Sequence, residues 1–195
     1  KIGIMDHDKV SISNLHRQVM FTSDDVGKYK VNILKKKINK INKKVKVKTY
    51  RVKAEDKNLG KILKQYDVIV DGTDNFKAKF LLNKFSLKYK KKLIIGAISK
   101  FEGHIFTFDF SLKKSPCLKC FYQGEPAEGV LDCETDGILG STAVITGSLQ
   151  ANEVLKAILN VGKNLNSHIL IIDLLNLKFR KVLFRKRKGC ICENI

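Results

Sequence analysis

The residues with the clearest capacity for chemistry stand in the segment "DHDKVSISNLHRQ", residues 6–18, directly after the apolar run Ile2–Met5. Such a run predicts a short buried strand at residues 1–5, and in doubly wound sheets ligands bind beyond the carboxyl ends of the strands. We therefore expect Asp6 to lie over a binding crevice, where its carboxylate could accept hydrogen bonds from ribose hydroxyls. A turn or a helix cap is the alternative role for a single Asp at this place.

Cysteines form a second group of candidates, and the sequence contains five of them. Cys117 and Cys120 make a C-x-x-C pair, and Cys190 and Cys192 follow much later in the chain. Four thiolates can close a tetrahedral zinc site, which would join the loop of the first pair to the segment of the second. Free buried thiols are the alternative. A disulfide framework is disfavoured, because nothing in the sequence indicates secretion.

The elements that must position these residues are strands that alternate with helices. A helix is predicted at residues 26–42, with Ser23 as its N-cap, because apolar residues recur there at helical spacing. Further strands are predicted at 45–52, 68–70, 93–98, 103–110, 168–175 and 178–185, and further helices at 58–65, from Phe76 onward and at 141–159. This alternation predicts an α/β fold, a Rossmann-like, mostly parallel sheet with helices on both faces, extended by antiparallel strands at the C-terminal side. We expect residues 1–195 to form a single domain.

The charge of the chain is strongly positive, with 38 basic and 19 acidic residues and a formal net charge of +19. Such a charge attracts anionic partners in general, and an A+T-rich coding sequence is the alternative explanation for so many lysines. Nucleic-acid recognition is disfavoured, since Lys dominates over Arg and Trp is absent. No apolar run approaches the roughly 20 residues that cross a bilayer, so we expect a cytoplasmic protein that does not enter the membrane.

Five motifs in a fixed order resemble the ThiF/MoeB/HesA family, which is related to the ubiquitin-activating enzymes. They are "DHDKVSISNLHRQ", "VGKYKV" at 26–31, "DGTDN" at 71–75, "GSLQANEVLK" at 147–156, and the paired cysteines. Each short motif is weak by itself, but together they run from Asp6 to Cys192 and cover nearly the whole chain.

The resemblance implies a role for the polar residues of these motifs. Asp6 would hold the ribose of ATP, Asn14, Arg17 and Lys30 would line the phosphates, and Asp74 would face the Mg²⁺. These residue types suit the attack of a carboxylate on the α-phosphate, because two anionic groups repel each other unless cations stabilise the phosphate oxygens. Taken singly, Arg17 and Lys30 could be solvated surface cations, and Asp74 could be the N-cap of the following helix.

The resemblance also implies a structural Zn²⁺ site made of Cys117, Cys120, Cys190 and Cys192. In the family both pairs are C-x-x-C, whereas the second pair here reads "GCIC" and is one residue short. One intervening residue can still present two sulfurs to a metal, although with less freedom of angle. Cys133 is a further catalytic candidate, because a cysteine near this place takes part in sulfur or acyl transfer in some relatives. Its acidic neighbours argue against a lowered thiol pKa.

The largest departure from the family is the glycine-rich nucleotide loop, which should precede Lys1 and does not occur in the chain. In the strand order 3-2-1-4, the strands at 1–5 and 68–70 would flank a central strand that the sequence does not contain. We therefore expect the chain to be a fragment of a longer polypeptide and to be inactive alone, because that loop supplies backbone N–H groups to the phosphates. Direct pairing of the two flanking strands would contradict this expectation.

For the intact protein we expect ATP-dependent adenylylation of the C-terminal Gly-Gly carboxylate of a ubiquitin-like sulfur-carrier protein. The protein would act as a homodimer in thiamin or molybdopterin synthesis. Alternatives in the same superfamily are a tRNA-modifying dehydratase and a peptide-modifying activator, which act on other carboxylates. Alternatives from other classes are a non-catalytic module that docks a ubiquitin-like protein, and a nucleic-acid binder. A Rossmann dehydrogenase is disfavoured, since it gives no reason for Asn14, Arg17, Lys30 and the paired cysteines.

Overall fold

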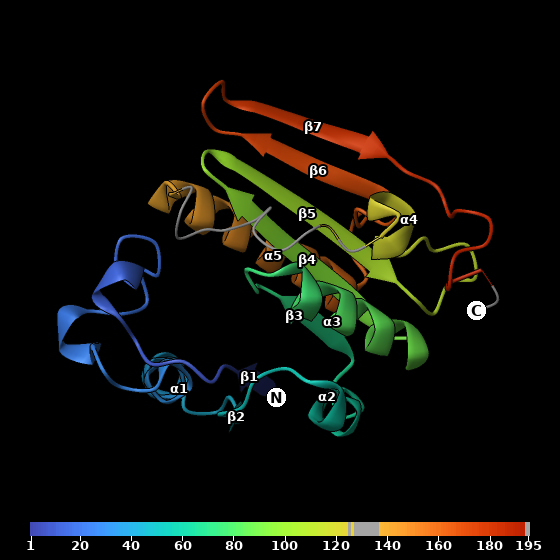
Figure 1. Cartoon of the computed structure of the whole chain (residues 1–195). Helices are drawn as coiled ribbons and strands as arrows, with labels where there is room; N and C mark the ends of the chain where they lie inside the picture. The colour runs from blue at the N-terminus through green and yellow to red at the C-terminus, as the bar shows by residue number, and fades with distance from the viewer. Residues whose placement is uncertain (125, 127–136, 194–195) are drawn as a thin grey trace. The chain divides into compact units, whose positions relative to one another are not determined.

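The computed structural model describes residues 1–124, 126 and 137–193. The chain divides into two compact units, Lys1–Glu55 and Asp56–Ile195 (Figure 1). Each unit has a β-sheet of its own. The single domain expected from the sequence stays a prediction. Within the described part of the chain, no helix combines the length and the apolar character that a membrane span requires.

The first unit is built on a pair of parallel strands and one helix. Two short 3-10 helices lie between the first strand and this helix. In chain order its elements are β1 (Ile2–Met5), η1 (Ile12–Asn14), η2 (Ser23–Asp25), α1 (Lys30–Ile41) and β2 (Val47–Tyr50). Strand β1 pairs with β2, and α1 packs against β2. A small core of Val10, Phe21 and Ile33 holds the loops between β1 and α1. Since Val10 and Phe21 lie in these loops, the core ties the polar segment 6–18 to helix α1.

Helix α1 begins at Lys30, later than predicted, and the predicted N-cap at Ser23 is wrong. Residues 23–25 form η2 instead. The chain then turns through Gly27, whose φ of +82° suits glycine, and the Gly27 N–H donates to the Val10 carbonyl. A residue with a φ of +82° cannot belong to a right-handed helix, so α1 begins after Gly27 and is shorter than the apolar spacing predicts.

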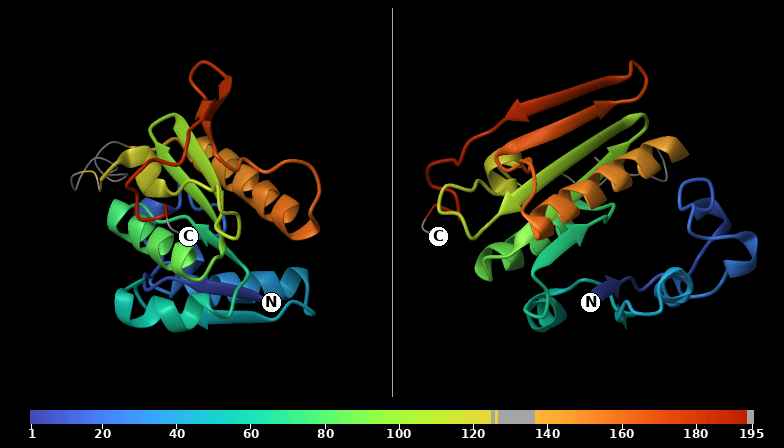
Figure 2. Two further views of the ribbon diagram at one scale, coloured as in Figure 1. Left: turned by 90° about the vertical axis from the view of Figure 1, so that its right-hand side faces the viewer. Right: turned by 180° about the vertical axis from the view of Figure 1, so that it is seen from behind.

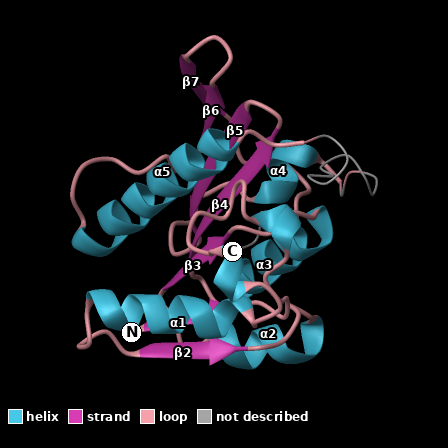
Figure 3. Cartoon of the chain, turned by 90° about the vertical axis from the view of Figure 1, so that its left-hand side faces the viewer, coloured by secondary structure: helices cyan, strands magenta, loops and turns pink. Residues whose placement is uncertain are grey.

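The second unit holds a five-stranded sheet in the order β3-β4-β5-β6-β7. In chain order its elements are α2 (Asp56–Leu63), β3 (Val68–Asp71), α3 (Phe76–Lys88), β4 (Lys92–Ser99), β5 (Glu102–Asp109), α4 (Leu118–Tyr122), α5 (Gly140–Leu159), β6 (His168–Asp173) and β7 (Lys178–Leu183). Strands β3 and β4 are parallel, and the three later pairs are antiparallel. Helix α5 covers one face of the sheet, and α3 and α4 lie on the other (Figure 2 and Figure 3). The predicted α/β fold, with parallel pairing, helices on both faces and an antiparallel C-terminal extension, is confirmed.

One hydrophobic core cluster of the second unit joins α5 to the sheet. Ile94, Ile105 and Ile172 are fully buried there, and Ile145 and Leu149 of α5 pack against them. Full burial of such side chains contributes about 1.5–3 kcal/mol each. The core therefore fixes α5 against the adjacent strands of the sheet.

Two strands that were expected to be buried carry exposed apolar side chains. Ile2 of β1 is 43% exposed, and Val70 of β3 is 52% exposed. Among the described residues, β2 is the one partner of β1, and β3 is an end strand of its sheet. The additional central strand and the longer polypeptide stay predictions.

Glu153 is a buried carboxylate that joins α5 to the rest of the second unit. It accepts hydrogen bonds from the Thr107 hydroxyl and the Leu165 N–H, both at 2.8 Å, and from the Asn164 side chain at 3.0 Å, and it pairs with Lys156. Burial acting alone would raise the pKa of Glu153, but the hydrogen bonds to Lys156, Leu165, Asn164 and Thr107 outweigh it and lower this pKa below its usual value.

Replacement of Glu153 by glutamine should reduce the free energy of unfolding at pH 7 by about 2–3 kcal/mol, because charge-assisted hydrogen bonds are lost. A carboxylate with a lowered folded-state pKa stabilises the fold above its unfolded pKa, and this contribution is lost as the pH falls through the folded pKa. The difference between wild type and Glu153→Gln should therefore shrink below about pH 4.5. Urea unfolding at several pH values measures it, with the exposed Glu102→Gln as control. A difference that stays constant down to pH 3 would contradict this assignment.

Candidate active site

Asp6 lies directly after β1, as predicted, and is half-buried. Its Oδ1 accepts a hydrogen bond of 2.8 Å from the backbone N–H of Asp8. The residue thus closes the turn that leaves the strand, which was the alternative role expected for it. A carboxylate has about four acceptor sites, so this turn leaves capacity for ribose hydroxyls. The two roles are compatible.

Lys30 is the first residue of α1, and it is buried rather than solvated, with 7% of its surface exposed. Its Nζ lies 3.3 Å from Asp8 Oδ2, and its backbone N–H donates to the Asp8 carbonyl at 3.1 Å. Asp8 itself is exposed, so a single carboxylate at the surface holds a nearly buried ammonium. This contact ties the first turn of α1 to the segment that follows β1.

Asn14 and Arg17 lie at and just beyond η1. Asn14 is buried, and its backbone carbonyl accepts from the N–H groups of Arg17 at 3.2 Å and Gln18 at 2.9 Å. The Arg17 guanidinium is half-buried and donates from Nη1 to the Ser13 carbonyl at 2.9 Å. Its remaining N–H groups can bind an anion. The Gln18 Oε1 is buried and has no hydrogen-bond partner among the described residues, and the sequence motif gave Gln18 no separate role.

Asp74 lies in the second unit, in the turn between β3 and α3, whereas the other four predicted nucleotide residues lie in the first unit. Its side chain is exposed and accepts from the Asn75 amide at 3.2 Å. The N-cap of α3 is Asn75, whose Oδ1 accepts from the Ala78 N–H at 2.8 Å. The alternative role of Asp74 as the helix cap is therefore wrong, and its carboxylate is available for another ligand.

A buried polar group behind this turn was missed by the sequence reasoning. It consists of Asp71, Lys79 and Gln150, all of which are buried. Lys79 stands beside Phe80 on the face of α3 that packs inward, and a lysine at such a position is almost never fully buried unless it is paired. That pattern is the signal from which the pair could have been found.

The four paired cysteines come together in the second unit. Cys117 Sγ lies 3.6 Å from Cys190 Sγ, Cys120 Sγ lies 3.4 Å from Cys192 Sγ, and all four sulfurs lie within 4.8 Å of one another. Sulfurs bound to one tetrahedral Zn²⁺ lie roughly 3.8 Å apart, since zinc–sulfur bonds are near 2.3 Å. The shortened "GCIC" pair thus reaches the cluster, and the residues fit a structural zinc ion. Cys133 lies outside the described residues.

The protonation of these thiols is shaped by their burial and by one another. Burial, followed by the influence of Cys120 and Cys190, raises the pKa of Cys117 to about 12. Burial likewise raises the pKa of Cys192. Burial also raises the pKa of Cys190, but hydrogen bonds from the Cys192 N–H and from the neighbouring thiols outweigh burial and lower this pKa overall. A metal ion would have to displace the protons that remain, so binding should release protons.

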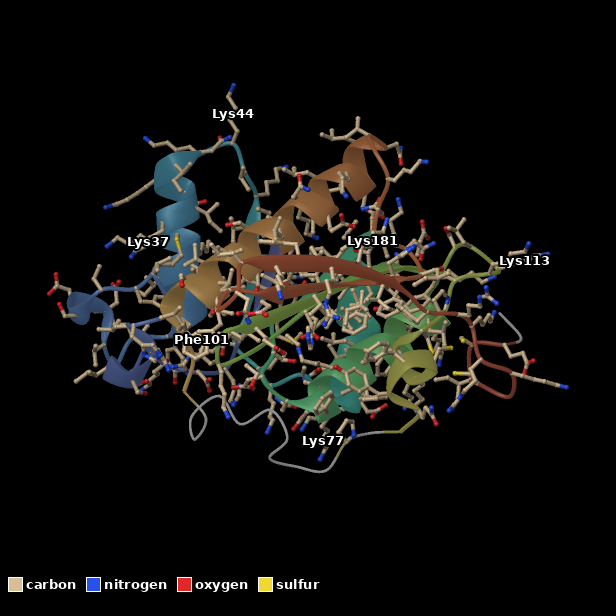
Figure 4. The ribbon with its side chains drawn as sticks, turned by 90° about the horizontal axis from the view of Figure 1, so that it is seen from above. Lys37, Lys44, Lys77, Phe101, Lys113 and Lys181 are labelled. Carbon is tan, nitrogen blue, oxygen red and sulfur yellow. The ribbon has the colours of Figure 1, made fainter. Side chains whose placement is uncertain are left out.

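The positive charge is spread over the surface of both units. Lysine side chains project from separate elements, among them Lys37 and Lys44 in the first unit and Lys77, Lys113 and Lys181 in the second (Figure 4). This spread matches the basic composition of the chain.

A model of the ThiF family matches residues 1–193. A sulfur carrier protein adenylyltransferase of Thermus thermophilus is 36% identical over 97% of this chain and 72% of its own length. A probable molybdopterin-synthase adenylyltransferase of Gracilaria tenuistipitata is 37% identical over 92% of this chain and 50% of its own length. The adenylyltransferase and sulfurtransferase MOCS3 of Culex quinquefasciatus is 35% identical over 96% of this chain and 43% of its own length. The chain thus spans half or less of the last two relatives.

Solved structures resemble the fold at lower identity. The crystal structure of Escherichia coli MccB with ATP superposes with a TM-score of 0.81 at 20% identity, covering 98% of this chain and 58% of MccB. The structure of PaaA superposes with a TM-score of 0.75 at 22% identity, covering 95% of this chain and 56% of PaaA. At these identities the likeness shows a shared fold.

Proposed function

Because the chain belongs to the ThiF family, we propose that the protein uses ATP to adenylylate the C-terminal carboxylate of a ubiquitin-like sulfur-carrier protein. The names of the relatives support this reaction, since they describe adenylyltransferases of a sulfur carrier and of molybdopterin synthase. The chain covers half or less of several relatives, so the activity is proposed for the full-length protein.

In the proposed reaction, an oxygen of the carrier carboxylate attacks the α-phosphorus of ATP. A carbon–oxygen–phosphorus linkage forms, and the bond from the α-phosphorus to the bridging oxygen of pyrophosphate breaks. Pyrophosphate leaves with the electron pair of that bond, and the carrier is left as an acyl-adenylate. Both reacting groups are anionic, so fixed cations and hydrogen-bond donors must stabilise the charge that they bring together.

The observation that carries the proposal is the placement of Lys30. Its ammonium is nearly buried and lies 3.3 Å from Oδ2 of Asp8. Asp8 belongs to the segment that also carries Asp6 and Arg17. A cation held in a site of low dielectric interacts more strongly with phosphate than an exposed one does, and it needs no reorganisation during the reaction. Many lysines of this chain are solvated, and this one is not.

Three further residues of the first unit would bind the rest of the nucleotide. Asp6 would accept hydrogen bonds from the ribose hydroxyls. Arg17 would present two parallel N–H groups to phosphate oxygens, a geometry that lysine cannot reproduce. Asn14 would donate its side-chain amide to a phosphate oxygen from its buried place at the end of η1.

Two metal ions complete the proposal. The exposed Asp74 carboxylate is a hard oxygen ligand of the kind that Mg²⁺ prefers. When bound there, Mg²⁺ would neutralise the departing pyrophosphate. The sulfurs of Cys117, Cys120, Cys190 and Cys192 would hold a structural Zn²⁺ without taking part in the reaction. Transfer chemistry at Cys133, the homodimer, a cytoplasmic location and the choice between thiamin and molybdopterin synthesis stay predictions.

The test is ATP–pyrophosphate exchange by the full-length protein with ubiquitin-like carriers that end in Gly-Gly. Exchange is expected with a free C-terminus, and none is expected with an amidated one, because no oxygen is left to attack phosphorus. Arg17→Ala should lower the rate by at least about 100-fold, the usual cost of removing one preorganised donor. Arg51→Ala is the matched control, since Arg51 lies in the same unit and stacks on Tyr29, 4.3 Å from the ring centre.

Each other outcome points away from the proposal. Equal exchange with free and amidated carriers would remove the carboxylate from the reaction. Exchange with a short peptide but with no ubiquitin-like carrier would favour a peptide-modifying activator. Tight carrier binding without exchange would favour a non-catalytic module.

A further inference from the structure

The turn that carries Asp74 is held at both ends. Asp71 is the last residue of β3, and its Oδ1 accepts hydrogen bonds from the Thr73 N–H at 2.9 Å and from the Thr73 hydroxyl at 2.8 Å. Asn75 holds the other end by capping α3. The Asp74 side chain itself is exposed, so burial does not fix its direction. The direction of the Asp74 carboxylate therefore depends on the backbone of the turn, which the hydrogen bonds of Asp71 and Asn75 hold in place.

Lys79 of α3 supplies the countercharge that Asp71 requires. Only 2% of the Lys79 side chain and none of the Asp71 side chain is exposed, and Lys79 Nζ lies 3.2 Å from Asp71 Oδ2. Lys79 also donates a hydrogen bond of 2.8 Å to the Gly96 carbonyl of β4. A buried charge that loses its partner is strongly unfavourable, so the surrounding groups would rearrange without Lys79. The arrangement that lets Asp71 bind Thr73 therefore depends on a lysine one helical turn beyond Asn75.

Gln150 of α5 braces the same strand end from the other face of the sheet. Its Nε2 donates to the Asp71 carbonyl at 2.9 Å, and the Ile94 carbonyl of β4 lies 3.4 Å away. The Gln150 side chain can occupy this position because residue 96 is a glycine, since a Cβ there would clash with it. Backbone and side chain of Asp71 are thus held by two different helices, Gln150 from α5 and Lys79 from α3.

We propose that Lys79 is a positioning residue for adenylylation, which acts through Asp71 to fix the Asp71–Asp74 turn and so the direction of the Asp74 carboxylate. The inference rests on the proposed function. Lys79 does not touch the nucleotide in this proposal. Its loss would shift Asp74 within a folded protein, and a displacement of about 1 Å at a reacting centre can lower a rate by about 100-fold.

The first test is Lys79→Met in the full-length protein, measured by carrier-dependent exchange and by circular dichroism. We expect kcat to fall by about 100-fold, with the helical signal retained. Lys79→Arg should recover most of the rate, because arginine restores the charge beside Asp71. Lys84→Met is the matched control on the same helix, since Lys84 is exposed and pairs with the exposed Asp56. Its rate should equal that of the wild type.

A double-mutant cycle separates positioning from a general loss of stability. If Lys79 acts through Asp74, Lys79→Met should raise the Mg²⁺ concentration needed for half-maximal rate, and it should add little to the effect of Asp74→Asn. A merely structural lysine would change neither quantity in the folded fraction. Multiplicative effects of the two substitutions, or an unchanged Mg²⁺ dependence in Lys79→Met, would overturn the inference.

Gln150→Met provides a second variant in case Lys79→Met does not fold. It removes the hydrogen bond to the Asp71 carbonyl without removing a charge, and it should lower kcat by about 10-fold with the same shift in Mg²⁺ dependence. An unchanged rate would count against the inference. If the wild type itself shows no carrier-dependent exchange, the proposed function fails; if the wild type is active and folded Lys79→Met is equally active, only the positioning role fails.

Discussion

Substitution of Lys30 by methionine is expected to lower the kcat of carrier-dependent exchange by about 100- to 1,000-fold while the protein keeps its fold. The reason is that Lys30 offers a preorganised ammonium, buried beside Asp8, to the phosphate oxygens. Methionine has a similar length and fills the same space without the charge. The partner left behind, Asp8, is about half exposed and can be solvated, so little stability should be lost.

The control for Lys30 is its close neighbour Lys28. Lys28 is exposed, and its Nζ donates to the Asp24 carbonyl, so Lys28→Met removes one positive charge two residues before Lys30 without touching the buried contact. Its exchange rate should stay within about twofold of wild type, because surface charges act weakly at physiological salt. If Lys28→Met and Lys30→Met lowered the rate equally, the effect would belong to overall charge rather than to the placement of Lys30.

The second large effect is expected at the cysteine cluster. Cys190→Ser should reduce bound zinc from one ion per chain to nearly none and strongly lower the midpoint of urea unfolding. Structural Zn²⁺ sites contribute on the order of 10 kcal/mol in small metal-dependent domains, and one lost ligand of four removes much of that. The measurements are metal content of the purified full-length protein and its unfolding with and without a chelator.

Thiol reactivity distinguishes zinc from the alternative of free buried thiols. In the zinc-bound protein, Cys117, Cys120, Cys190 and Cys192 should react slowly with a thiol reagent, and they should become reactive when a chelator is added. Cys133→Ser is the control, since Cys133 belongs to neither cysteine pair of the sequence, and the zinc content should be unchanged. Purified wild-type protein without zinc, or Cys190→Ser with full zinc, would contradict the zinc site.

Local patterns predicted much of the fold. Helix α5 and the β6–β7 hairpin were predicted at nearly their observed places, because each has continuous apolar spacing and clear turns on both sides. The start of α1 was predicted wrongly, because the turn at Gly27 is fixed by a hydrogen bond to Val10, and sequence spacing does not reveal such a contact between distant segments. The apolar runs predicted buried strands at Ile2 and Val70, whereas the missing central strand predicted from the family resemblance would leave one flank of each strand unpaired.

In the candidate site, too, the sequence predicts features that depend on neighbouring residues better than features that depend on contacts between distant segments. The four sulfurs meet as expected, although the spacing of Cys190 and Cys192 alone did not settle whether the second pair could reach the first. The cap of α3 was assigned to Asp74 as an alternative, and the structure gives it to Asn75, one residue later, because capping depends on backbone angles within the turn. The Asp71–Lys79 pair was missed because, among 38 basic residues, the position of Lys79 beside Phe80 on the inner face of α3 is what marks it as buried, and this signal was not used.

The central claim is the proposed role of Lys30 and Arg17, which would bind the phosphates of ATP. The most direct measurement is an experimental structure of the full-length protein with Mg²⁺ and a non-hydrolysable ATP analogue. The account predicts Asp6 on the ribose, Arg17 and Lys30 on the phosphates, and Asp74 on the metal ion beside the same triphosphate. A nucleotide whose phosphates contact neither Arg17 nor Lys30 would contradict the claim.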